Sequence, residues 1–498
     1  MRYVGSLDQG TTSTRFMIFD SNGSVVGKHQ IEHQQILPKP GYVEHDAVEI
    51  WNAVEIAISG ALKNANLIGS DLAGIGITNQ RETTVAWDSE TGNPLSNAIV
   101  WQDTRTQEWL NHFTEEEKRS IIYQTGLAIA PYFSGSKMNW LINHVSAVSQ
   151  ASAAGRLKFG TIDSWLVYKL TGGAQTGLHV TDVTNASRTL LMDLETLEWD
   201  HELLSLFGIS KSTLPEIHSS SEIYGYTDPN GPFGASIPIA AILGDQQAAM
   251  VGQTCFGRGD SKTTYGTGNF TLLNTGTEIV RSKAGLLTTV CFKFGDQPAN
   301  YALEGSVAVT GSAVQWLRDQ LGIISHTSEI ELLAKSVPDN GGVYFVPAFS
   351  GLFAPYWRSD ARGVIVGLTR AVTKAHLARA ALEAICYQTR DVIDAMVSET
   401  EIPMKEMRVD GGITMNELCM QMQADILGIE ISRPVIGETT ALGAAYAAGL
   451  AVGVWKDADE LRSHWLESER WKPRAGRLRT EGYESWKRAV ARTLNWID

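Results

Sequence analysis

The chain contains 498 residues, of which 43% are hydrophobic and 19% charged, and its formal net charge is −14. This length and composition predict a globular protein of two or three domains, each with its own core. The negative charge argues against nucleic acid or an anionic membrane surface as the main partner. No apolar run in the sequence reaches the ~18 residues that a membrane-spanning helix needs.

The four cysteines, at positions 255, 291, 386 and 419, lie far apart in the sequence and show no metal-ligand spacing. The opening residues "MRYVGSLDQG" do not resemble a secretory signal, because their apolar run is too short. We therefore expect a cytoplasmic protein whose cysteines are buried, reduced thiols.

The first eighty residues alternate strand and helix patterns. Residues 3–7, 15–20 and 24–31 predict three strands, the last two separated by the turn "DSNG". Residues 46–65 predict a helix capped by Asp46, because apolar residues recur there every three or four positions. Those residues are Val48, Trp51, Val54, Ile58 and Leu62. Residues 73–78 then predict a strand, and continued alternation along the chain indicates an α/β protein.

The second half of the chain repeats the opening pattern. Residues 260–280, "DSKTTYGTGNFTLLNTGTEIV", predict strand, glycine–threonine turn, strand, turn and strand, about 255 positions after the first hairpin. Residues 404–428 predict strand, Gly-Gly turn and helix, and residues 441–455 a closely packed helix rich in small residues. Hairpins with such turns are common, but two of them suggest a duplicated scaffold with a cleft between its halves. We place the domains at 1–252 and 253–498.

Three glycine-rich turns are candidates for nucleotide binding. In "LDQGTTSTR", Asp8 precedes Gly10 and a run of hydroxyl residues, which suits either an ordinary tight turn or a cradle for phosphate and Mg²⁺. The turn "YGTGNF" at 265–270 offers a second set of backbone donors, and "VDGGITMNE" at 409–417 lets a base or ribose approach the backbone. No Gly-x4-Gly-Lys-Ser/Thr segment occurs, so the chain is not a P-loop enzyme.

Two further segments carry residues suited to an alcohol substrate. In "ILGDQQAAM", Asp245 follows an apolar strand, where it is either a helix cap or the general base of phosphoryl transfer to an alcohol. In "TNQRETT", Arg81 and Glu82 form either an exposed ion pair or a donor–acceptor pair for a polyol, whose carbons Trp101 and Phe270 can wall. The residues alone thus predict an alcohol phosphotransferase without choosing its substrate.

Taken in order, a series of segments extends this interpretation over the whole chain. They are "LDQGTTSTR", "ITNQRETT", "NAIVWQDTRT", "PYFSGSK", "VTDVTNASRT", "GDQQAA", "YGTGNF", "NYALEGSV", "APYWRSDARG", "CYQTRD", "RVDGG" and "TALGAAY". The series resembles the FGGY family of carbohydrate kinases, and among them the glycerol kinases. The resemblance implies two actin-like, ribonuclease H-like domains flanking a cleft. It also implies phosphorylation of glycerol to sn-glycerol 3-phosphate with ATP and Mg²⁺, in a homo-oligomer, either dimer or tetramer.

The resemblance also implies a role for each matching residue. Glycerol ligands are Arg81, Glu82, Tyr132, Asp245 and Gln246, with Asp245 as the base and Trp101 and Phe270 as walls. The first phosphate loop consists of Thr11, Thr12, Ser13 and Arg15. The other nucleotide-binding positions are Thr267, Gly311, Gln315, Gly412 and Asn416. The metal-associated acid is Asp8. Two regulatory features of some relatives have no counterpart: residues 228–236 lack the arginine of a fructose 1,6-bisphosphate loop, and no histidine lies between His218 and His326.

Two other hypotheses stay open at this point. A related kinase of ketoses or longer polyols would need small residues in place of Trp101 and Phe270. A non-catalytic nucleotide switch on the same scaffold would have no use for Arg81, Glu82 and Tyr132 together.

Overall fold

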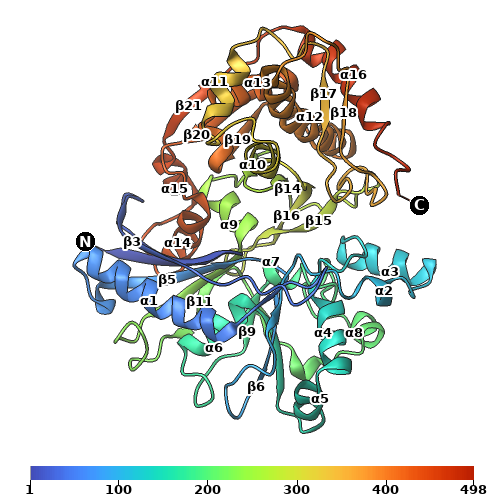
Figure 1. Ribbon diagram of the computed structural model, residues 1–498. Coiled ribbons are helices and arrows are strands. Elements are labelled where there is room, and N and C mark those ends of the chain that lie inside the picture. The colour runs from blue at the N-terminus through green and yellow to red at the C-terminus, as the bar shows by residue number, and fades with distance from the viewer. Residues whose placement is uncertain (1, 498) are drawn as a thin grey trace.

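Two mixed β-sheets, one in each half of the chain, form the core of the computed structural model, which describes residues 2–497 (Figure 1). The first sheet has the order β11-β12-β5-β1-β2-β3. Its strands are β1 (Tyr3–Gln9), β2 (Ser13–Phe19), β3 (Val25–Glu32), β5 (Leu72–Asn79), β11 (Ser221–Tyr226) and β12 (Pro238–Gly244). The second sheet has the order β15-β16-β14-β13-β19-β20-β21. Its strands are β13 (Ser261–Tyr265), β14 (Asn269–Gly276), β15 (Leu287–Phe292), β16 (Asn300–Val307), β19 (Glu406–Asp410), β20 (Glu430–Pro434) and β21 (Glu467–Trp471).

The pairing pattern confirms the duplicated scaffold. In the first sheet β3, β2 and β1 are antiparallel neighbours, β5 and β12 continue in parallel with β1, and β11 closes the edge antiparallel. In the second sheet β16, β14 and β13 are antiparallel, β19 and β20 follow in parallel, and β21 closes the edge antiparallel. One expectation was wrong: residues 278–280 are not the third strand of the repeat, because β14 takes Asn300–Val307 as its partner instead.

Smaller sheets and helices surround these cores. The short strands are β4 (Glu44–His45), β6 (Thr84–Asp88), β7 (Ala98–Ile99), β8 (Leu157–Thr161), β9 (Val180–Asp182), β10 (Glu216–His218), β17 (Tyr344–Val346) and β18 (Val364–Val366). The helices of the first half are α1 (Ala47–Ala65), α2 (Gln107–Leu110), α3 (Glu115–Thr125), α4 (Ser134–His144), α5 (Ser146–Ala153), α6 (Ile162–Leu170), α7 (Val183–Ala186), α8 (His201–Phe207) and α9 (Asp245–Gly252). Those of the second half are α10 (Gly311–Asp319), α11 (Glu329–Lys335), α12 (Lys374–Thr400), α13 (Glu417–Leu427), α14 (Thr439–Ala451), α15 (Ala458–His464) and α16 (Glu481–Val490). Within residues 2–497, none of the helices is both long and apolar enough to cross a bilayer.

Helix α1 begins where predicted but buries a different stripe. The Asp46 side chain caps it by accepting a hydrogen bond from the Val48 backbone N–H at 2.8 Å. Ile50, Val54 and Ile58 are fully buried, whereas Val48, which shares the apolar spacing, is 47% exposed. The reason is that alanines on the Ile50 side of the helix let it pack closely against β2 and β3.

The two halves meet through helices α9 and α14, which lie against each other in the middle of the molecule (Figure 1). A Cβ atom added at Gly252 would lie 1.9 Å from the Thr439 carbonyl oxygen, and one added at Gly443 would lie 1.8 Å from that of Ala248. Only glycine permits backbones to approach so closely. The close packing predicted around residues 441–455 is therefore confirmed for α14. All four cysteines are buried and free, also as expected.

Candidate functional site

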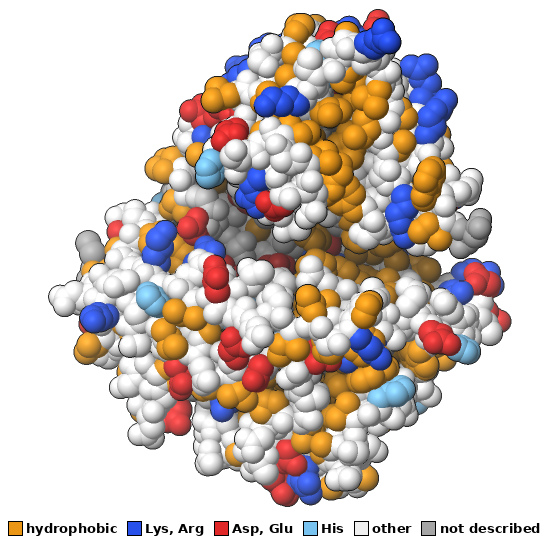
Figure 2. Space-filling model, viewed as in Figure 1, with side chains coloured by type: hydrophobic (Ala, Val, Ile, Leu, Met, Phe, Trp, Pro, Cys, Tyr) orange, Lys and Arg blue, Asp and Glu red, His pale blue; other side chains and the backbone are white. Residues whose placement is uncertain are grey.

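The polar residues predicted from strand ends gather at one edge of the first sheet, facing the second domain. Strands β1, β5 and β12 are parallel neighbours, so their carboxyl ends share this edge. Gln80 and Arg81 follow β5 directly, and Asp245 follows β12 as the first residue of α9. The surface is hollowed where the two domains meet (Figure 2). In an open α/β sheet, such an edge is the usual place for a ligand.

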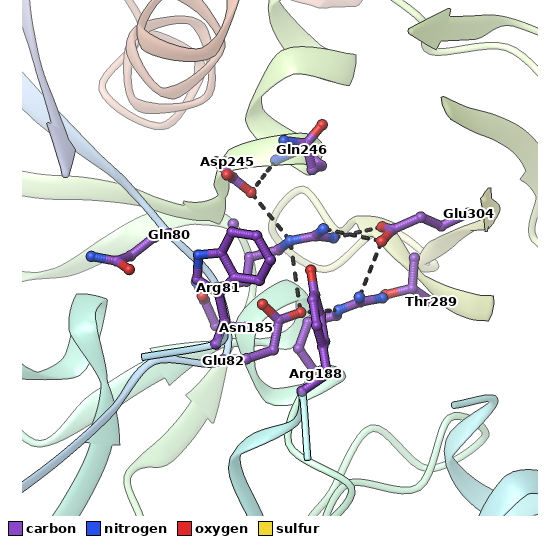
Figure 3. A network of polar contacts seen from close by, with 12 residues as sticks. Gln80, Arg81, Glu82, Asn185, Arg188, Asp245, Gln246, Thr289 and Glu304 are labelled. Atoms are coloured by element: carbon purple, nitrogen blue, oxygen red, sulfur yellow. Dashed lines mark hydrogen bonds and ion pairs between the residues drawn. The ribbon is translucent and has the colours of Figure 1, made fainter. Parts of the chain in front are cut away.

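A cluster of buried ion pairs lies at this edge of the sheet (Figure 3). The guanidinium of Arg81 binds Glu304 through two hydrogen bonds, Nη1–Oε2 at 2.6 Å and Nη2–Oε1 at 3.0 Å. Arg81 Nε lies 3.1 Å from Oδ1 of Asp245, which also accepts the Gln246 backbone N–H at 2.7 Å. The second oxygen of Asp245, Oδ2, accepts no hydrogen bond from any described residue, and the side chain is 33% exposed. Asp245 is thus held by one oxygen and offers the other to the cleft.

A second arginine completes the cluster. Arg188 Nε lies 2.7 Å from Glu82 Oε1, and Arg188 Nη2 lies 3.1 Å from Glu304 Oε1. Burial by itself would raise the pKa of the Glu304 carboxyl, but Arg188 and Arg81 more than offset this and hold the pKa at about 2. Glu304 belongs to the second domain, whereas both arginines belong to the first, so this carboxylate joins the two domains at the site.

Sequence reasoning gave no role to Glu304 or Arg188. Both lie in segments that carried the family resemblance, "NYALEGSV" and "VTDVTNASRT". One signal was available: Glu304 is a charged residue in the middle of a strand whose neighbours are apolar or small. A lone acid in such a strand is rarely buried without a cationic partner.

Aromatic rings wall the space above the cluster. The rings of Trp101 and Tyr132 meet edge to face at 5.4 Å between centroids, and Phe270 lies 6.0 Å from the Arg81 guanidinium. Tyr132 is fixed through Lys137, whose ammonium donates to the carbonyls of residues 131, 132 and 133 at 2.8, 2.6 and 3.3 Å. Burial lowers the pKa of Lys137 to about 7. Gln246, also predicted here, instead accepts a hydrogen bond from the buried Lys262 ammonium at 2.5 Å.

The predicted first phosphate loop lies between β1 and β2. The Thr11 hydroxyl accepts a hydrogen bond from Trp101 Nε1 at 3.0 Å, and Thr12 is exposed. Ser13 and Arg15 both bond the Gln30 amide, at 3.1 Å each. Arg15 also reaches toward Glu438 of the second domain, 3.9 Å away. The loop is therefore anchored by its side chains and leaves Thr12 open to the cleft.

Asp8 lies inside β1, opposite Arg15. Burial raises the pKa of its carboxyl to about 6, Arg15 opposes this, and Asp245 and Glu438 add to it. Among residues 2–497, no three His, Cys, Asp or Glu side chains are arranged to hold a metal ion. Mg²⁺ usually takes only one or two carboxylates and completes its shell with phosphate and water, so the half-buried Asp8 carboxylate fits that role.

The predicted nucleotide residues of the second domain lie on two neighbouring segments. In the first, the Thr267 carbonyl accepts the backbone N–H groups of Thr310 and Ser312, which fixes the β13–β14 turn against the start of α10. Gly311 begins α10 and Gln315 is exposed on it.

In the second segment, Gly412 is exposed just after β19, and Asn416 caps α13 by accepting the Cys419 backbone N–H at 2.9 Å. Strands β13 and β19 are parallel neighbours, so the two segments share one edge. The structure thus brings Phe270 of the second domain to the polyol residues of the first. The predicted nucleotide residues are divided between the first phosphate loop and these two segments of the second domain.

Comparison with known proteins accounts for this arrangement. Residues 3–252 match the N-terminal domain of the FGGY family of carbohydrate kinases, and residues 262–452 match its C-terminal domain. The chain belongs to the FGGY family of carbohydrate kinases. The FGGY kinase is 60% identical over 499 residues to glycerol kinase 1 of Streptomyces coelicolor, covering 99% of this chain and 98% of that protein. It is 59% identical over 500 residues to a glycerol kinase of Mycobacterium tuberculosis, covering 100% of this chain and 97% of that protein.

Solved structures of other FGGY kinases share the fold. The crystal structure of Plasmodium falciparum glycerol kinase with ADP superposes with a TM-score of 0.93 and 40% identity, covering 99% of this chain and 98% of that one. The gluconate kinase of Lactobacillus acidophilus has a TM-score of 0.85 at 23% identity, covering 99% and 96% of the two chains. The expected two-domain α/β fold is thereby confirmed.

Proposed function

We propose that this FGGY kinase transfers the terminal phosphate of ATP to glycerol and forms sn-glycerol 3-phosphate. The relatives named above as glycerol kinases, at 60% and 59% identity over almost the whole chain, support this substrate. The observation that carries the proposal is the arrangement of Arg81, Glu82 and Asp245 beneath the paired rings of Trp101 and Tyr132. A small polyol needs donors and acceptors for its hydroxyls and apolar walls for its carbons.

Each polar residue of the proposed site retains one group for the substrate. Glu82 gives Oε1 to Arg188, and its Oε2 accepts no hydrogen bond from any described residue. Arg81 pairs its Nε–H with Asp245 and donates to Glu304 through both terminal nitrogens, and Nη1 also donates to Gln247 Oε1 at 3.3 Å. Of its five N–H groups, one hydrogen on Nη2 is left. Glycerol hydroxyls would meet one acceptor and one donor there. Gln246 completes the proposed set from the first turn of α9.

Asp245 is the proposed general base. Its Oδ2 accepts the proton of the attacking hydroxyl, while the contacts of Oδ1 with Arg81 and the Gln246 N–H fix the carboxylate plane. The oxygen of glycerol forms a bond to the γ-phosphorus as the bond from that phosphorus to the bridging oxygen of ADP breaks. Phe270 and Trp101 exclude water from the carbon chain.

The nucleotide is proposed to lie between the two glycine-rich turns. Backbone N–H groups of residues 11–13 and 267–268, the Thr12 hydroxyl and Arg15 would bind the phosphates. Gly311, Gln315, Gly412 and Asn416 would bind the nucleoside. Asp8 would hold Mg²⁺ together with phosphate and water. When bound, the ion neutralises charge that develops on the phosphates.

Three further features belong to the proposal. The domain boundary between residues 252 and 253 rests on the repeated hairpins, the cytoplasmic location on the scattered cysteines, and the homo-oligomer on the resemblance. Sedimentation of the purified chain would distinguish monomer, dimer and tetramer.

The test of the proposed function is ATP-dependent phosphate transfer, with Mg²⁺, to glycerol, dihydroxyacetone, erythritol, xylulose and gluconate. We expect glycerol to have the largest kcat/KM. If a five- or six-carbon compound had the largest kcat/KM instead, the proposed phosphate sites would stand, but the proposed polyol pocket would be wrong. ATP binding without transfer to any of the five would instead favour a nucleotide switch.

A further inference from the structure

A second buried polar cluster lies behind the first phosphate turn, apart from the ion pairs of Arg81 and Glu304. Its members are Gln9, Gln35, His45, Gln80 and Thr83, and the side chain of Gln80 points away from Asp245 (Figure 3). His45 is 0% exposed and Gln80 is 1% exposed. Burying this many polar groups is costly, because each loses its hydrogen bonds to water and has to find partners within the protein.

Three successive carbonyl groups of the turn accept hydrogen bonds, two from this cluster and one from the neighbouring backbone. Gln80 Nε2 donates to the Gly10 carbonyl at 3.2 Å, and Gln35 Nε2 donates to that of Thr11 at 2.8 Å. The backbone N–H of His33 donates to the Thr12 carbonyl at 3.2 Å. In a trans peptide the N–H points opposite to the carbonyl that precedes it. Three carbonyls drawn inward therefore direct the N–H groups of the following residues outward, where a phosphate would meet them.

The hydrogen-bond partners determine the tautomer of His45. Because the Thr11 carbonyl can only accept, the nitrogen of the Gln35 amide must face it, and the amide oxygen must face His45. His45 Nε2, 2.8 Å from that oxygen, therefore carries the proton. His45 Nδ1 is then an acceptor that faces Gln80 Nε2, 3.3 Å away. The two hydrogens of that amide nitrogen are shared among His45 Nδ1, Gln9 Oε1 at 3.0 Å and the Gly10 carbonyl at 3.2 Å. A proton on Nδ1 would place two donors face to face and break this link.

The same cluster reaches the wall of the polyol pocket. The Thr83 hydroxyl donates to Gln80 Oε1 at 2.9 Å and accepts the backbone N–H of Trp101 at 3.2 Å. The indole Nε1 of Trp101 donates to the Thr11 hydroxyl at 3.0 Å. A closed path of hydrogen bonds thus joins Trp101 to the turn along two routes, one direct and one through Gln80.

We propose that His45 is a positioning residue that fixes the first phosphate turn and links its geometry to the Trp101 wall. The proposal rests on the function proposed above and deepens it. His45 touches neither substrate: it orients the two amides that hold the turn. A substrate that orders Trp101 thereby also orders the groups that grip the phosphates.

The electrostatic surroundings keep His45 in the form that this role requires. Burial lowers the pKa of His45 to about 3, with a smaller contribution from the neighbouring His33 ring, 4.7 Å away between centroids. Within residues 2–497, no carboxylate is bonded to His45; its ring faces His33, Gln35 and Gln80. The imidazole is accordingly neutral over the range in which a kinase is assayed.

The test compares His45→Phe with a matched variant, His179→Phe, in the full-length protein. His179 is a second histidine of the same domain whose pKa is lowered by burial, to about 4. It donates one hydrogen bond, to the Phe159 carbonyl at 2.7 Å, and its ring meets Trp87 edge to face at 5.2 Å. Both substitutions keep an aromatic ring and remove ring nitrogens, but only that at position 45 affects the turn.

We expect His45→Phe to raise the KM for ATP and the dissociation constant of ADP about tenfold, the effect of losing one well-aligned hydrogen bond. The dissociation constant of glycerol should change less than twofold, and His179→Phe should change neither ligand. His45→Gln, whose amide can donate and accept, should recover part of the affinity. Equal nucleotide binding in the phenylalanine variants at positions 45 and 179 would overturn the proposal.

A second measurement does not depend on turnover or on the stability of a variant. In ¹⁵N-labelled wild-type protein, the His45 ring should show a protonated Nε2 and an unprotonated Nδ1 from pH 8 down to pH 5. A ring that titrates near pH 6.5, or that carries its proton on Nδ1, contradicts the assigned network. ADP binding and this signal remain measurable if glycerol is not the substrate, so failure of the proposed function can be told apart from failure of this inference.

Discussion

The two domains share one sheet design but present different groups at its edge. In the first domain the parallel strands β5 and β12 lead into Arg81 and Asp245, both of which are charged. In the second, the corresponding strand β19 leads into Gly411 and Gly412. The first domain therefore offers side-chain chemistry, and the second offers bare backbone. A duplicated scaffold can thus divide the work between an alcohol and a nucleotide.

The comparison extends to the packed helices α9 and α14. Asp245 is the first residue of α9, and Glu438 immediately precedes α14 after β20. Asp245 contacts the buried Arg81, whereas Glu438 contacts the more exposed Arg15 and Lys28, at 3.9 and 3.6 Å. Equivalent acids thus lie in unlike surroundings, which allows each to serve as a control for the other.

The largest effect is expected from Asp245→Asn. The amide keeps the shape of the carboxylate but cannot take the proton of the attacking hydroxyl, so kcat should fall about a thousandfold. Glycerol should still bind, because Arg81 and Glu82 remain. Steady-state kinetics and glycerol titration of the variant measure the two quantities separately.

The control is the equivalent substitution in the other half, Glu438→Gln. It also removes one carboxylate at the start of an interdomain helix, and we expect kcat to fall less than tenfold. If kcat fell equally in Asp245→Asn and Glu438→Gln, the acid of the first domain would have no special role in turnover, and Asp245 would not be the base.

The sheet pattern that both domains share was predictable, because glycine and threonine mark its turns and few other residues suit such turn positions. The third strand of the second domain was not. Residues 278–280 have a strand-like composition, but β14 pairs with Asn300–Val307, and β15 intervenes in the chain. Pairing across such an insertion depends on the tertiary fold, which local composition does not contain.

The next largest effect is expected from Glu304→Gln, which breaks the bond between the domains. Arg81 and Arg188 would lose a shared buried carboxylate, and an unpaired buried charge costs about 3–5 kcal/mol of unfolding free energy. Glycerol affinity should also fall, because Glu304 no longer holds the Arg81 guanidinium in place. Urea unfolding and glycerol titration at pH 7 measure both effects.

The matched control is Glu383→Gln, a buried ion pair inside the second domain. Glu383 binds Arg379 at 2.9 Å and Asn340 at 2.8 Å, and its loss should lower stability without changing glycerol affinity. If Glu383→Gln weakened glycerol binding as much as Glu304→Gln, the loss of glycerol affinity in the Glu304 variant would come from its lower stability.

The pH dependence of the Glu304 variant gives a further check. The folded pKa of about 2 lies below the ordinary value of 4.5, so the stabilisation from Glu304 is complete above pH 4.5 and is lost as the pH falls toward 2. The wild type should therefore lose more unfolding free energy than Glu304→Gln over that interval. Parallel curves would mean that Glu304 is not ionised in the folded protein.

The parts of the site differ in how far the sequence disclosed them. Arg81 and Asp245 follow apolar strands directly, a position that is typical of ligand-binding residues. Glu304 and His45 lie within strands, where the pattern predicts core. Arg81 and Glu304 are 223 positions apart and belong to different domains, so the role of Glu304 becomes visible only when the domains are assembled. His45 has its partners Gln35 and Gln80 in its own domain, 10 and 35 positions away, and they meet only when that domain folds.

The smallest effect is expected from Gly412→Ala, which tests the bare backbone of the second domain. A Cβ added at Gly412 meets no protein atom within 4 Å, so stability should be unchanged. If the nucleoside lies against this backbone, the methyl group occupies its place, and the KM for ATP should rise a few-fold with no change in that for glycerol. Gly476→Ala is the control, since it too meets nothing within 4 Å, but it lies outside the nucleotide segments. Identical ATP kinetics in both variants would move the nucleoside away from Gly412, and the division of work between the domains would then rest on the Thr267 turn alone.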